Sequence, residues 1–187
     1  MKGWVYKQVY KGKNVHIGPF SLIGQPAECY EVWQRYPTID NYEYSVEIGD
    51  NTIITGMCTI DAGTIRHTKI GKNCFIMKQV HIGHDATIGD RVTIAPGAVV
   101  GGHVVIYEGA YIGMKAVIHQ RQIIPPFAML GANSFLPKGK EMKPFEIWAG
   151  SPARFLKINE VAIKRNNFTS KQINEYREQW ESLKLES

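Results

Sequence analysis

The clearest pattern in the chain is an aliphatic residue at every sixth position through its central part. The series consists of Ile70, Ile76, Ile82, Ile88, Ile94, Val100, Ile106, Ile112, Ile118, Ile124 and Leu130. The apolar face of a helix recurs about every 3.6 residues and that of a strand about every 2, so neither period explains this spacing. It predicts a solenoid in which stacked coils share one continuous core.

A second series supports the same fold. Four positions after the aliphatic residues stand small or β-branched side chains, with Gln122 as the exception: Cys74, Val80, Ala86, Val92, Ala98, Val104, Ala110, Ala116, Ala128 and Ser134. Glycine often follows the aliphatic residue directly, as at Gly83 and Gly113, where a chain that turns a corner would use its conformational freedom. Three hexapeptides then form one triangular coil of about eighteen residues.

The repeat is interrupted twice in the N-terminal part. Ile48, Ile54 and Ile60 keep the period, and a four-residue slip over 66–69 then restores the frame at Ile70. Residues 25–45 break the period and contain several aromatic side chains, namely Tyr30, Trp33, Tyr36, Tyr42 and Tyr44. A loop of this length inside a repeat array is either functional or a packing flap.

After Leu136 the repeat decays, and from Asn159 the apolar period becomes helical. Thr169 and Gln172 have the spacing of a capping box that opens a helix to about Leu183. We therefore expect an all-β solenoid over residues 1–157, with the loop 25–45 inserted. A helical segment over 158–187 would cover its open end, as the terminal cap of a solenoid must.

Composition narrows the class of protein. The 187 residues carry a net charge of +5 without a massed basic tract, which argues against nucleic-acid binding. Cys29, Cys58 and Cys74 have no CxxC spacing, so packed, reduced thiols are expected in place of disulfides or a zinc site. No apolar run approaches the ~20 residues of a membrane span, and the N-terminus carries no signal core, so a cytoplasmic protein is expected.

Histidines supply the candidate chemistry. Four of the six lie in the repeat, at His81, His84, His103 and His119. Because Ile82 points inward, His84 should face outward, and Gly102 lies one coil away at roughly the inter-strand spacing of ~4.8 Å. An imidazole beside an unobstructed N–H suits acyl transfer, in which a base takes a proton and a donor stabilises the oxyanion. Asp85 is placed to stabilise the charged imidazole.

A single histidine is more often a surface residue, but the cluster around His84 favours catalysis. Its surroundings resemble a known family in the runs Thr68-Lys-Ile-Gly-Lys, His81-Ile-Gly-His-Asp-Ala-Thr-Ile-Gly-Asp, Gly101-Gly-His103 and Val117-Ile-His119-Gln120, and in the tail Ile163-Lys-Arg-Asn-Asn-Phe-Thr. These segments resemble the UDP-N-acetylglucosamine O-acyltransferases, which begin lipid A synthesis for lipopolysaccharide. The resemblance implies the left-handed parallel β-helix of the hexapeptide acyltransferases, and a homotrimer with its sites between subunits.

The resemblance also implies roles for single residues. His84 corresponds to the catalytic base, Asp85 to its neighbouring carboxylate and Gly102 to the oxyanion donor. The positions implied to line the cleft or bind substrate are His81, His103, His119 and Gln120, and those implied to hold nucleotide-sugar phosphates are Asn159 and Arg165. Asp61 stands where the family has a sugar-binding histidine, so it is expected to contact the acceptor, and no metal is expected.

The function expected is transfer of an acyl group from a thioester to a hydroxyl or amine of a sugar, and the sugar is expected to be nucleotide-linked. The donor is a thioester of acyl carrier protein or of coenzyme A, and no cofactor stays bound. The run Trp148-Ala-Gly-Ser-Pro-Ala-Arg154 resembles the end of coenzyme-A-dependent acetyltransferases. Two alternatives stay open: a metalloenzyme of the γ-class carbonic anhydrase type, which binds zinc through three histidines, and a non-catalytic structural repeat protein.

Overall fold

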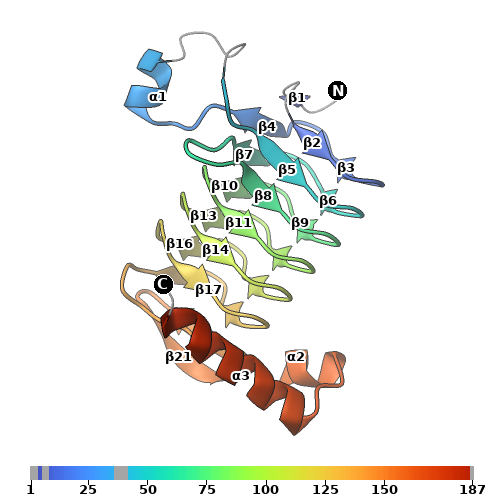
Figure 1. The fold of residues 1–187 in the computed structure, drawn as a ribbon, viewed down its shortest axis with the longest axis vertical. Coiled ribbons are helices and arrows are strands. Elements are labelled where there is room, and N and C mark those ends of the chain that lie inside the picture. The colour runs from blue at the N-terminus through green and yellow to red at the C-terminus, as the bar shows by residue number, and fades with distance from the viewer. Residues whose placement is uncertain (1–3, 6–8, 36–41, 186–187) are drawn as a thin grey trace.

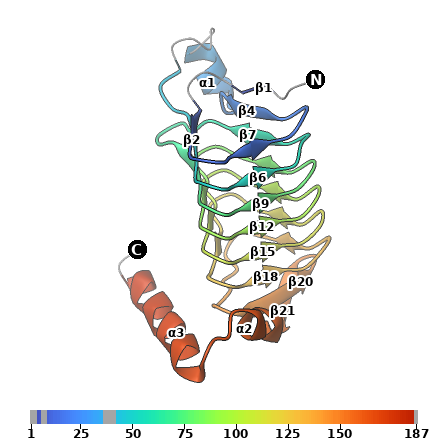
Figure 2. The same cartoon turned by 90° about the vertical axis from the view of Figure 1, so that its right-hand side faces the viewer.

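The computed structural model describes residues 4–5, 9–35 and 42–185. They form a parallel β-helix whose coils stack along the long axis of the molecule (Figures 1 and 2). Helix α1 (Tyr30–Arg35) lies beside the N-terminal end, whereas α2 (Glu160–Arg165) and α3 (Ser170–Leu185) lie at the other end. The predicted hexapeptide solenoid with C-terminal helices is therefore confirmed. Residues 36–41 of the inserted loop, including Tyr36, fall outside the described residues.

Each coil contributes one strand to each of three sheets. Sheet A contains β1 (Trp4–Val5), β4 (Leu22–Gln25), β7 (Thr59–Asp61), β10 (His81–Ile82), β13 (Val99–Val100), β16 (Val117–Ile118) and β19 (Phe135–Leu136). Sheet B contains β2 (Tyr10–Lys11), β5 (Val46–Ile48), β8 (Thr68–Ile70), β11 (Thr87–Ile88), β14 (Val105–Ile106) and β17 (Ile123–Ile124). Sheet C contains β3 (His16–Ile17), β6 (Ile53–Ile54), β9 (Phe75–Ile76), β12 (Thr93–Ile94), β15 (Tyr111–Ile112), β18 (Met129–Leu130), β20 (Glu146–Gly150) and β21 (Ala153–Ile158).

The two residue series of the repeat build the core. Ile82 pairs with Val100 and Val100 with Ile118, so equivalent positions are eighteen residues apart. Every member of the six-residue aliphatic series from Ile70 to Leu130 is at most 3% exposed. The small residues four positions later are also buried, and even Gln122 is only 7% exposed. Inward side chains therefore carry the stability of the fold, and outward and corner positions are left for chemistry.

The corners are built differently from what the glycine pattern predicts. The residues in the left-handed backbone region include Asp85, His103 and Arg121, at φ 58°, 59° and 62°. The glycines that follow the inward aliphatic residues between Ile70 and Leu130 are not among them. Gly83 is required because a Cβ there would lie 2.8 Å from Gly102 N, and Gly113 because a Cβ would lie 2.5 Å from Ala132 N. Close approach of the next coil, not conformational freedom, selects these glycines.

Residues 137–158 close the C-terminal end of the core. Strand β20 continues sheet C in parallel with β18 and then pairs antiparallel with β21, a hairpin that the repeat pattern did not predict. Met142 and Ala153 are fully buried in the core cluster. None of the described helices is both long and apolar enough to cross a lipid bilayer.

Helix α3 begins at the predicted capping box. Gln172 N donates to Thr169 Oγ1 at 3.3 Å, and Thr169 N donates to Gln172 Oε1 at 2.9 Å. The helix packs along the side of the solenoid, where the Trp180 ring lies edge-on to Tyr107 at 5.3 Å. It therefore braces the corner after β14 in addition to extending the C-terminal end.

Candidate active site

The candidate catalytic residues lie along a single edge of the solenoid, the corner between sheets A and B. Successive coils place there the described parts of the insert (25–35 and 42–45), the slip loop 62–67, the pair His84–Asp85, the pair Gly102–His103 and Gln120–Arg121. The eighteen-residue step stacks Asp85 against His103, and His84 against Gly102. Sequence spacing thus brings together His84, Asp85, Gly102 and His103 as predicted.

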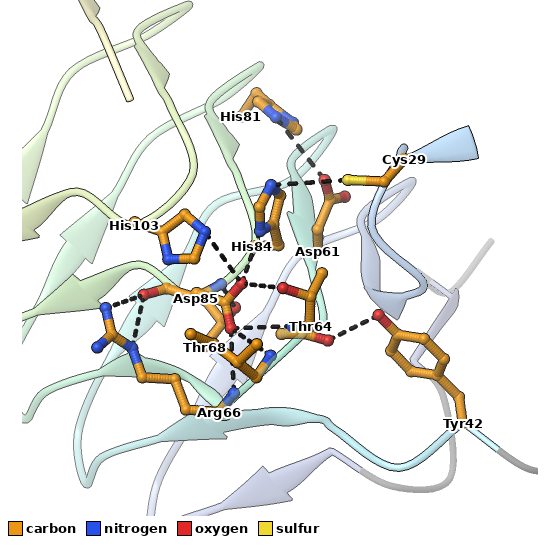
Figure 3. Close-up of polar contacts among 12 residues, drawn as sticks. Cys29, Tyr42, Asp61, Thr64, Arg66, Thr68, His81, His84, Asp85 and His103 are labelled. Atoms are coloured by element: carbon orange, nitrogen blue, oxygen red, sulfur yellow. Dashed lines mark hydrogen bonds and ion pairs between the residues drawn. The ribbon is translucent and has the colours of Figure 1, made fainter. Parts of the chain in front are cut away.

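Asp85 is the buried centre of this corner (Figure 3). Its Oδ1 accepts hydrogen bonds from three consecutive backbone amides, those of Thr64 at 2.9 Å, Ile65 at 3.0 Å and Arg66 at 3.1 Å. Its Oδ2 accepts from Thr64 Oγ1 at 2.6 Å. The extra residues of the slip therefore lie at 62–67, slightly before the 66–69 expected from the repeat, and form a loop that wraps this carboxylate. Such a loop is a backbone nest for an anion.

The cradle fixes the charge of Asp85. Burial alone would raise the pKa of this carboxyl, but hydrogen bonds from His84, Thr64 and the Ile65 N–H outweigh it and hold the pKa well below its ordinary value. Asp85 is therefore an anion at neutral pH, although its side chain is fully buried.

His84 is held by this anion in one tautomer. Its Nδ1 lies 2.7 Å from Asp85 Oδ2. An ionised carboxylate only accepts, so the Nδ1 carries the hydrogen and the Nε2 of the neutral ring is left with a free lone pair. The side chain is 20% exposed. This is the orientation of a general base that is steered by a buried acid.

Gly102 lies directly against the His84 ring. A Cβ on Gly102 would stand 2.7 Å from His84 Nε2, so any side chain there would displace the imidazole. Among the residues described, none accepts a hydrogen bond from Gly102 N–H, whereas the neighbouring Gly101 N–H donates to Ile118 O. The arrangement leaves an amide donor beside the base, as an oxyanion site needs.

His103 shares the carboxylate with His84. Its Nε2 lies 3.6 Å from Asp85 Oδ2, and its ring meets that of His84 edge-on at 5.0 Å. Burial lowers the pKa of His103, and the positive charge of Arg121 lowers it further, against the opposing effect of Asp85. A neutral His103 therefore packs against His84 without competing for the charge of Asp85.

His81 and Asp61 form a second polar pair on sheet A. His81 Nδ1 lies 2.8 Å from Thr59 Oγ1, and its Nε2 lies 4.0 Å from Asp61 Oδ2. Gln25 donates its amide to Asp61 Oδ1 at 3.0 Å. Burial raises the pKa of Asp61, with Gln25 and His81 opposing that rise. Asp61 therefore places a buried acid close to His84.

The inserted loop reaches this site from both of its ends. Cys29 Sγ lies 3.9 Å from His84 Nε2, which makes Cys29 a site residue where the sequence predicted a packed thiol. Cys58 and Cys74 are the buried free thiols expected. Tyr42 donates its hydroxyl to Gly63 O at 2.6 Å and so fastens the slip loop (Figure 3). Of the two interpretations of the insert, its described residues favour a functional element.

Arg165 lies elsewhere, in a cavity of about 420 Å³ between α2 and sheet C. The lining includes Arg91, Tyr111, Asn159, Arg165 and Asn166. Asn159 is also the N-cap of α2, since its Oδ1 accepts from Ala162 N at 3.2 Å and its Nδ2 donates to Phe127 O at 2.9 Å. With both ends of its amide engaged, Asn159 shapes the cavity. Arg165 supplies positive charge, whereas the Arg91 guanidinium is paired with Glu108 Oε2 at 2.6 Å.

The cavity and the histidine corner lie on opposite sides of one chain. The corner joins sheets A and B, and the cavity rests on sheet C. His119 and Gln120 lie on the A–B corner, where His119 Nδ1 contacts Gln120 O at 3.0 Å and Gln120 is exposed. One chain therefore brings together all predicted residues except Asn159 and Arg165.

A metal is the competing use of this cluster. His84, Asp85 and His103 offer ligand atoms within 4.8 Å of one another. However, Asp85 already accepts from three amides, a hydroxyl and an imidazole, so a cation bound to it would have to displace these donors. The geometry therefore suits a steering carboxylate better than a metal ligand.

Sequence reasoning missed Cys29, Gln25, Thr64 and Arg66. Arg66 donates from its Nε and Nη2 to Asp85 O at 3.2 Å and 3.0 Å. The available signal was the irregularity itself, because the missed residues lie in the two segments that leave the six-residue frame. Their spacing does not reveal which corner they occupy.

Comparison with known proteins agrees with the repeat. Residues 67–102 match the family model described as bacterial transferase hexapeptide (six repeats). No curated protein matches the chain. Among solved structures, LpxA from Acinetobacter baumannii is 28% identical with a TM-score of 0.78, and the match covers 92% of this chain and 64% of that chain. UDP-N-acetylglucosamine acyltransferase from Campylobacter jejuni is 26% identical with a TM-score of 0.76, covering 95% and 74%.

A more distant structure carries ligands. PerB from Caulobacter crescentus, solved in complex with CoA and GDP-perosamine, is 17% identical with a TM-score of 0.61, covering 78% of this chain and 58% of that chain. At this identity the likeness shows the fold alone. The chain spans less than two thirds of the Acinetobacter LpxA chain. Together, the matched repeat and the shared solenoid place the chain in the superfamily of hexapeptide-repeat β-helix transferases.

Proposed function

We propose that this protein is an acyltransferase that moves an acyl group from a thioester to an amine or hydroxyl of a sugar, with His84 as the general base. The observation that carries this proposal is the 2.7 Å contact between His84 Nδ1 and the cradled Asp85. It leaves Nε2 as the basic atom, and Gly102 lies against that atom with an unengaged N–H. Base and oxyanion donor are the two groups that acyl transfer requires.

The chemistry follows from the charges. As the acceptor attacks the thioester carbonyl, His84 Nε2 takes its proton and the ring becomes cationic beside the Asp85 anion. Gly102 N–H stabilises the negative oxygen of the tetrahedral intermediate. Collapse of that intermediate expels the thiolate of the donor, which takes the proton back from His84. The fixed cradle of Asp85 means that no reorganisation is needed when the positive charge develops.

Asp61 supports an amine as the acceptor group. It is 2% exposed, and among the described residues the amide of Gln25 is the one side chain that donates a hydrogen bond to it, with His81 Nε2 at 4.0 Å. A sugar ammonium group would complete its hydrogen bonds, and transfer of a proton to the nearby histidines would free the amine for attack. A phosphate would be repelled at this position.

Arg165 supports a nucleotide-linked sugar. Its cavity of about 420 Å³ is large enough for a small ligand, and a guanidinium group offers paired donors to phosphate oxygens. The LpxA structures are those of UDP-N-acetylglucosamine acyltransferases, and PerB was solved with GDP-perosamine. The acyl donor is proposed to be a thioester of coenzyme A or of acyl carrier protein. The PerB structure contains CoA.

The two half-sites support a homotrimer. Because the His84 corner and the Arg165 cavity lie on opposite sides of one chain, a single substrate bridges them only between neighbouring subunits. Closed cyclic symmetry then gives three equivalent sites.

The test is a transfer assay with acyl-CoA and acyl carrier protein donors against UDP- and GDP-linked amino sugars and their hydroxyl counterparts. His84→Ala should lower kcat by roughly 10²–10⁴, the usual contribution of a positioned base. His16→Ala removes an exposed imidazole of sheet C and is the matched control. Full activity in His84→Ala, with a folded trimer, would refute the assignment.

A further inference from the structure

The insert contributes a side chain that single-step acyl transfer leaves without a task. Cys29, the residue before α1, directs its sulfur at His84 Nε2, the basic atom of the site, at 3.9 Å (Figure 3). The same imidazole contacts Asp85 through its other nitrogen at 2.7 Å. The three residues form a continuous line of thiol, imidazole and buried carboxylate. That order is the arrangement of a nucleophile, its base and the group that orients the base.

We propose that Cys29 is a catalytic nucleophile that carries the acyl group as a thioester between donor and acceptor. The inference rests on the proposed function and divides it into two transfers. It assigns the inserted loop a chemical role, because the loop supplies the nucleophile and the solenoid supplies its base.

The two steps balance without any further reactant. In the first, Cys29 Sγ attacks the carbonyl carbon of the acyl thioester while His84 Nε2 takes the thiol proton. The new Sγ–C bond forms, the bond from carbon to the donor sulfur breaks, and the departing thiolate takes the proton from His84. In the second, the amine or hydroxyl attacks the Cys29 thioester, His84 takes its proton, and the Cys29 thiolate leaves and is reprotonated.

The surroundings of Cys29 require the base. Burial raises the pKa of the Cys29 thiol, and the negative charges of Glu31, Asp61 and Asp85 raise it further. The resting group is therefore a neutral thiol, which is a weak nucleophile until a neighbouring base removes its proton. His84 is the base within reach. In this structure the Cys29 thiol contacts His84 Nε2, the atom that would take the proton of the acceptor in single-step transfer.

Access separates Cys29 from the other two thiols. Cys58 and Cys74 are at most 2% exposed and belong to the core, where an acyl thioester cannot reach them. Cys29 is partly exposed on the A–B corner. The chain thus contains matched controls, since all three residues are free thiols and only one contacts a histidine.

The experiment is intact-protein mass spectrometry after incubation with acetyl-CoA and decanoyl-CoA in the absence of acceptor, with acid quenching. We expect one acyl adduct per chain, located on Cys29 by peptide mapping and removed by neutral hydroxylamine, as a thioester is. Cys58→Ala and Cys74→Ala should form the adduct at the parent rate. Cys29→Ala should form none, and His84→Ala should form it at least about a hundredfold more slowly than His16→Ala.

Steady-state kinetics provide the second readout. Cys29→Ala and Cys29→Ser should lower kcat by at least about a hundredfold, and the parent should exchange labelled CoA into acyl-CoA without acceptor. An adduct that no sugar discharges would refute the proposed acceptor but leave the nucleophile standing. Conversely, Cys29→Ala with full turnover, no exchange and no adduct in the parent would overturn the nucleophile and leave His84-dependent single-step transfer intact.

Discussion

Asp85 serves several partners at once. It steers His84, lies beside His103, and receives the three amides of residues 64–66 together with the hydroxyl of Thr64. Its backbone is held equally firmly, since Asp85 N donates to Thr68 Oγ1 at 2.9 Å and Arg66 binds its carbonyl. One buried charge therefore couples the local fold to the orientation of the base.

This coupling predicts a pH-dependent stability difference for Asp85→Asn. The amide nitrogen of Asn would face donors, at a cost of about 1–3 kcal/mol for each group left unpaired. The folded-state pKa of Asp85 is depressed below the ordinary 3.8, so its contribution is fully present above about pH 4 and is lost as pH falls through the folded value. Urea unfolding at pH 7 should show the variant less stable than the parent. The difference in unfolding free energy should shrink progressively below pH 4. A difference that stays constant with pH would contradict the claim that the loop 62–67 stabilises an ionised Asp85.

His103 should matter less to catalysis than His84. Its Nε2 is 3.6 Å from Asp85, and its other contacts are with the His84 ring. His103→Ala should lower kcat by less than about tenfold, since it removes a packing partner and not the proton acceptor. Equal losses in His103→Ala and His84→Ala would instead indicate a shared metal, which elemental analysis of the parent for zinc would detect.

At this scale the sequence predicted the solenoid side of the site. His84, Gly102 and Asp85 follow from the eighteen-residue step, because the repeat fixes which residues stack. Cys29 and Arg66 belong to segments without a period, and their position depends on loop closure over the corner. Asn159 was expected from the sequence to bind phosphate. In the structure its Oδ1 caps α2 and its Nδ2 donates to Phe127 O, so both ends of its amide have structural partners.

Among the elements, α2 contributes the cationic cavity. Arg165 is the last residue of this helix and lines the cavity on sheet C. Arg91, from the corner before β12, also lines it. Arg165→Ala should raise the KM for a nucleotide-linked acceptor by roughly tenfold or more while kcat changes little, since a grip on phosphate is shared by the ground and transition states. Arg177→Ala, on the exposed face of α3, is the matched control. Unchanged nucleotide-sugar affinity in Arg165→Ala, measured by calorimetry, would move the acceptor to free sugars or other small amines.

At the scale of the whole molecule, the proposed site is complete only between subunits of a trimer. Light scattering should give about three times the chain mass of 21.1 kDa. With the acceptor far below its KM, Arg165→Ala chains alone should also be about tenfold less active than the parent. Under these conditions, equal amounts of His84→Ala and Arg165→Ala chains refolded together should regain about a quarter of the parent activity, because that fraction of interfaces pairs an intact His84 with an intact Arg165. A control preparation in which every chain carries both substitutions should regain none of the parent activity. No recovery in the first mixture, with mixed trimers present, would place both residues in one subunit.

The placement of the two irregular segments bears on how such a protein changes over evolutionary time. The stacking of coils depends on inward positions, so extra residues at a corner leave the register intact and add a loop-closure cost that grows only slowly with length. The insert 25–45 and the slip loop 62–67 both stand at the A–B corner, and both reach His84 or Asp85. A repetitive frame of this kind can acquire new chemistry by corner insertions. The corners are accordingly free to change, whereas the inward positions have to stay apolar for the coils to stack.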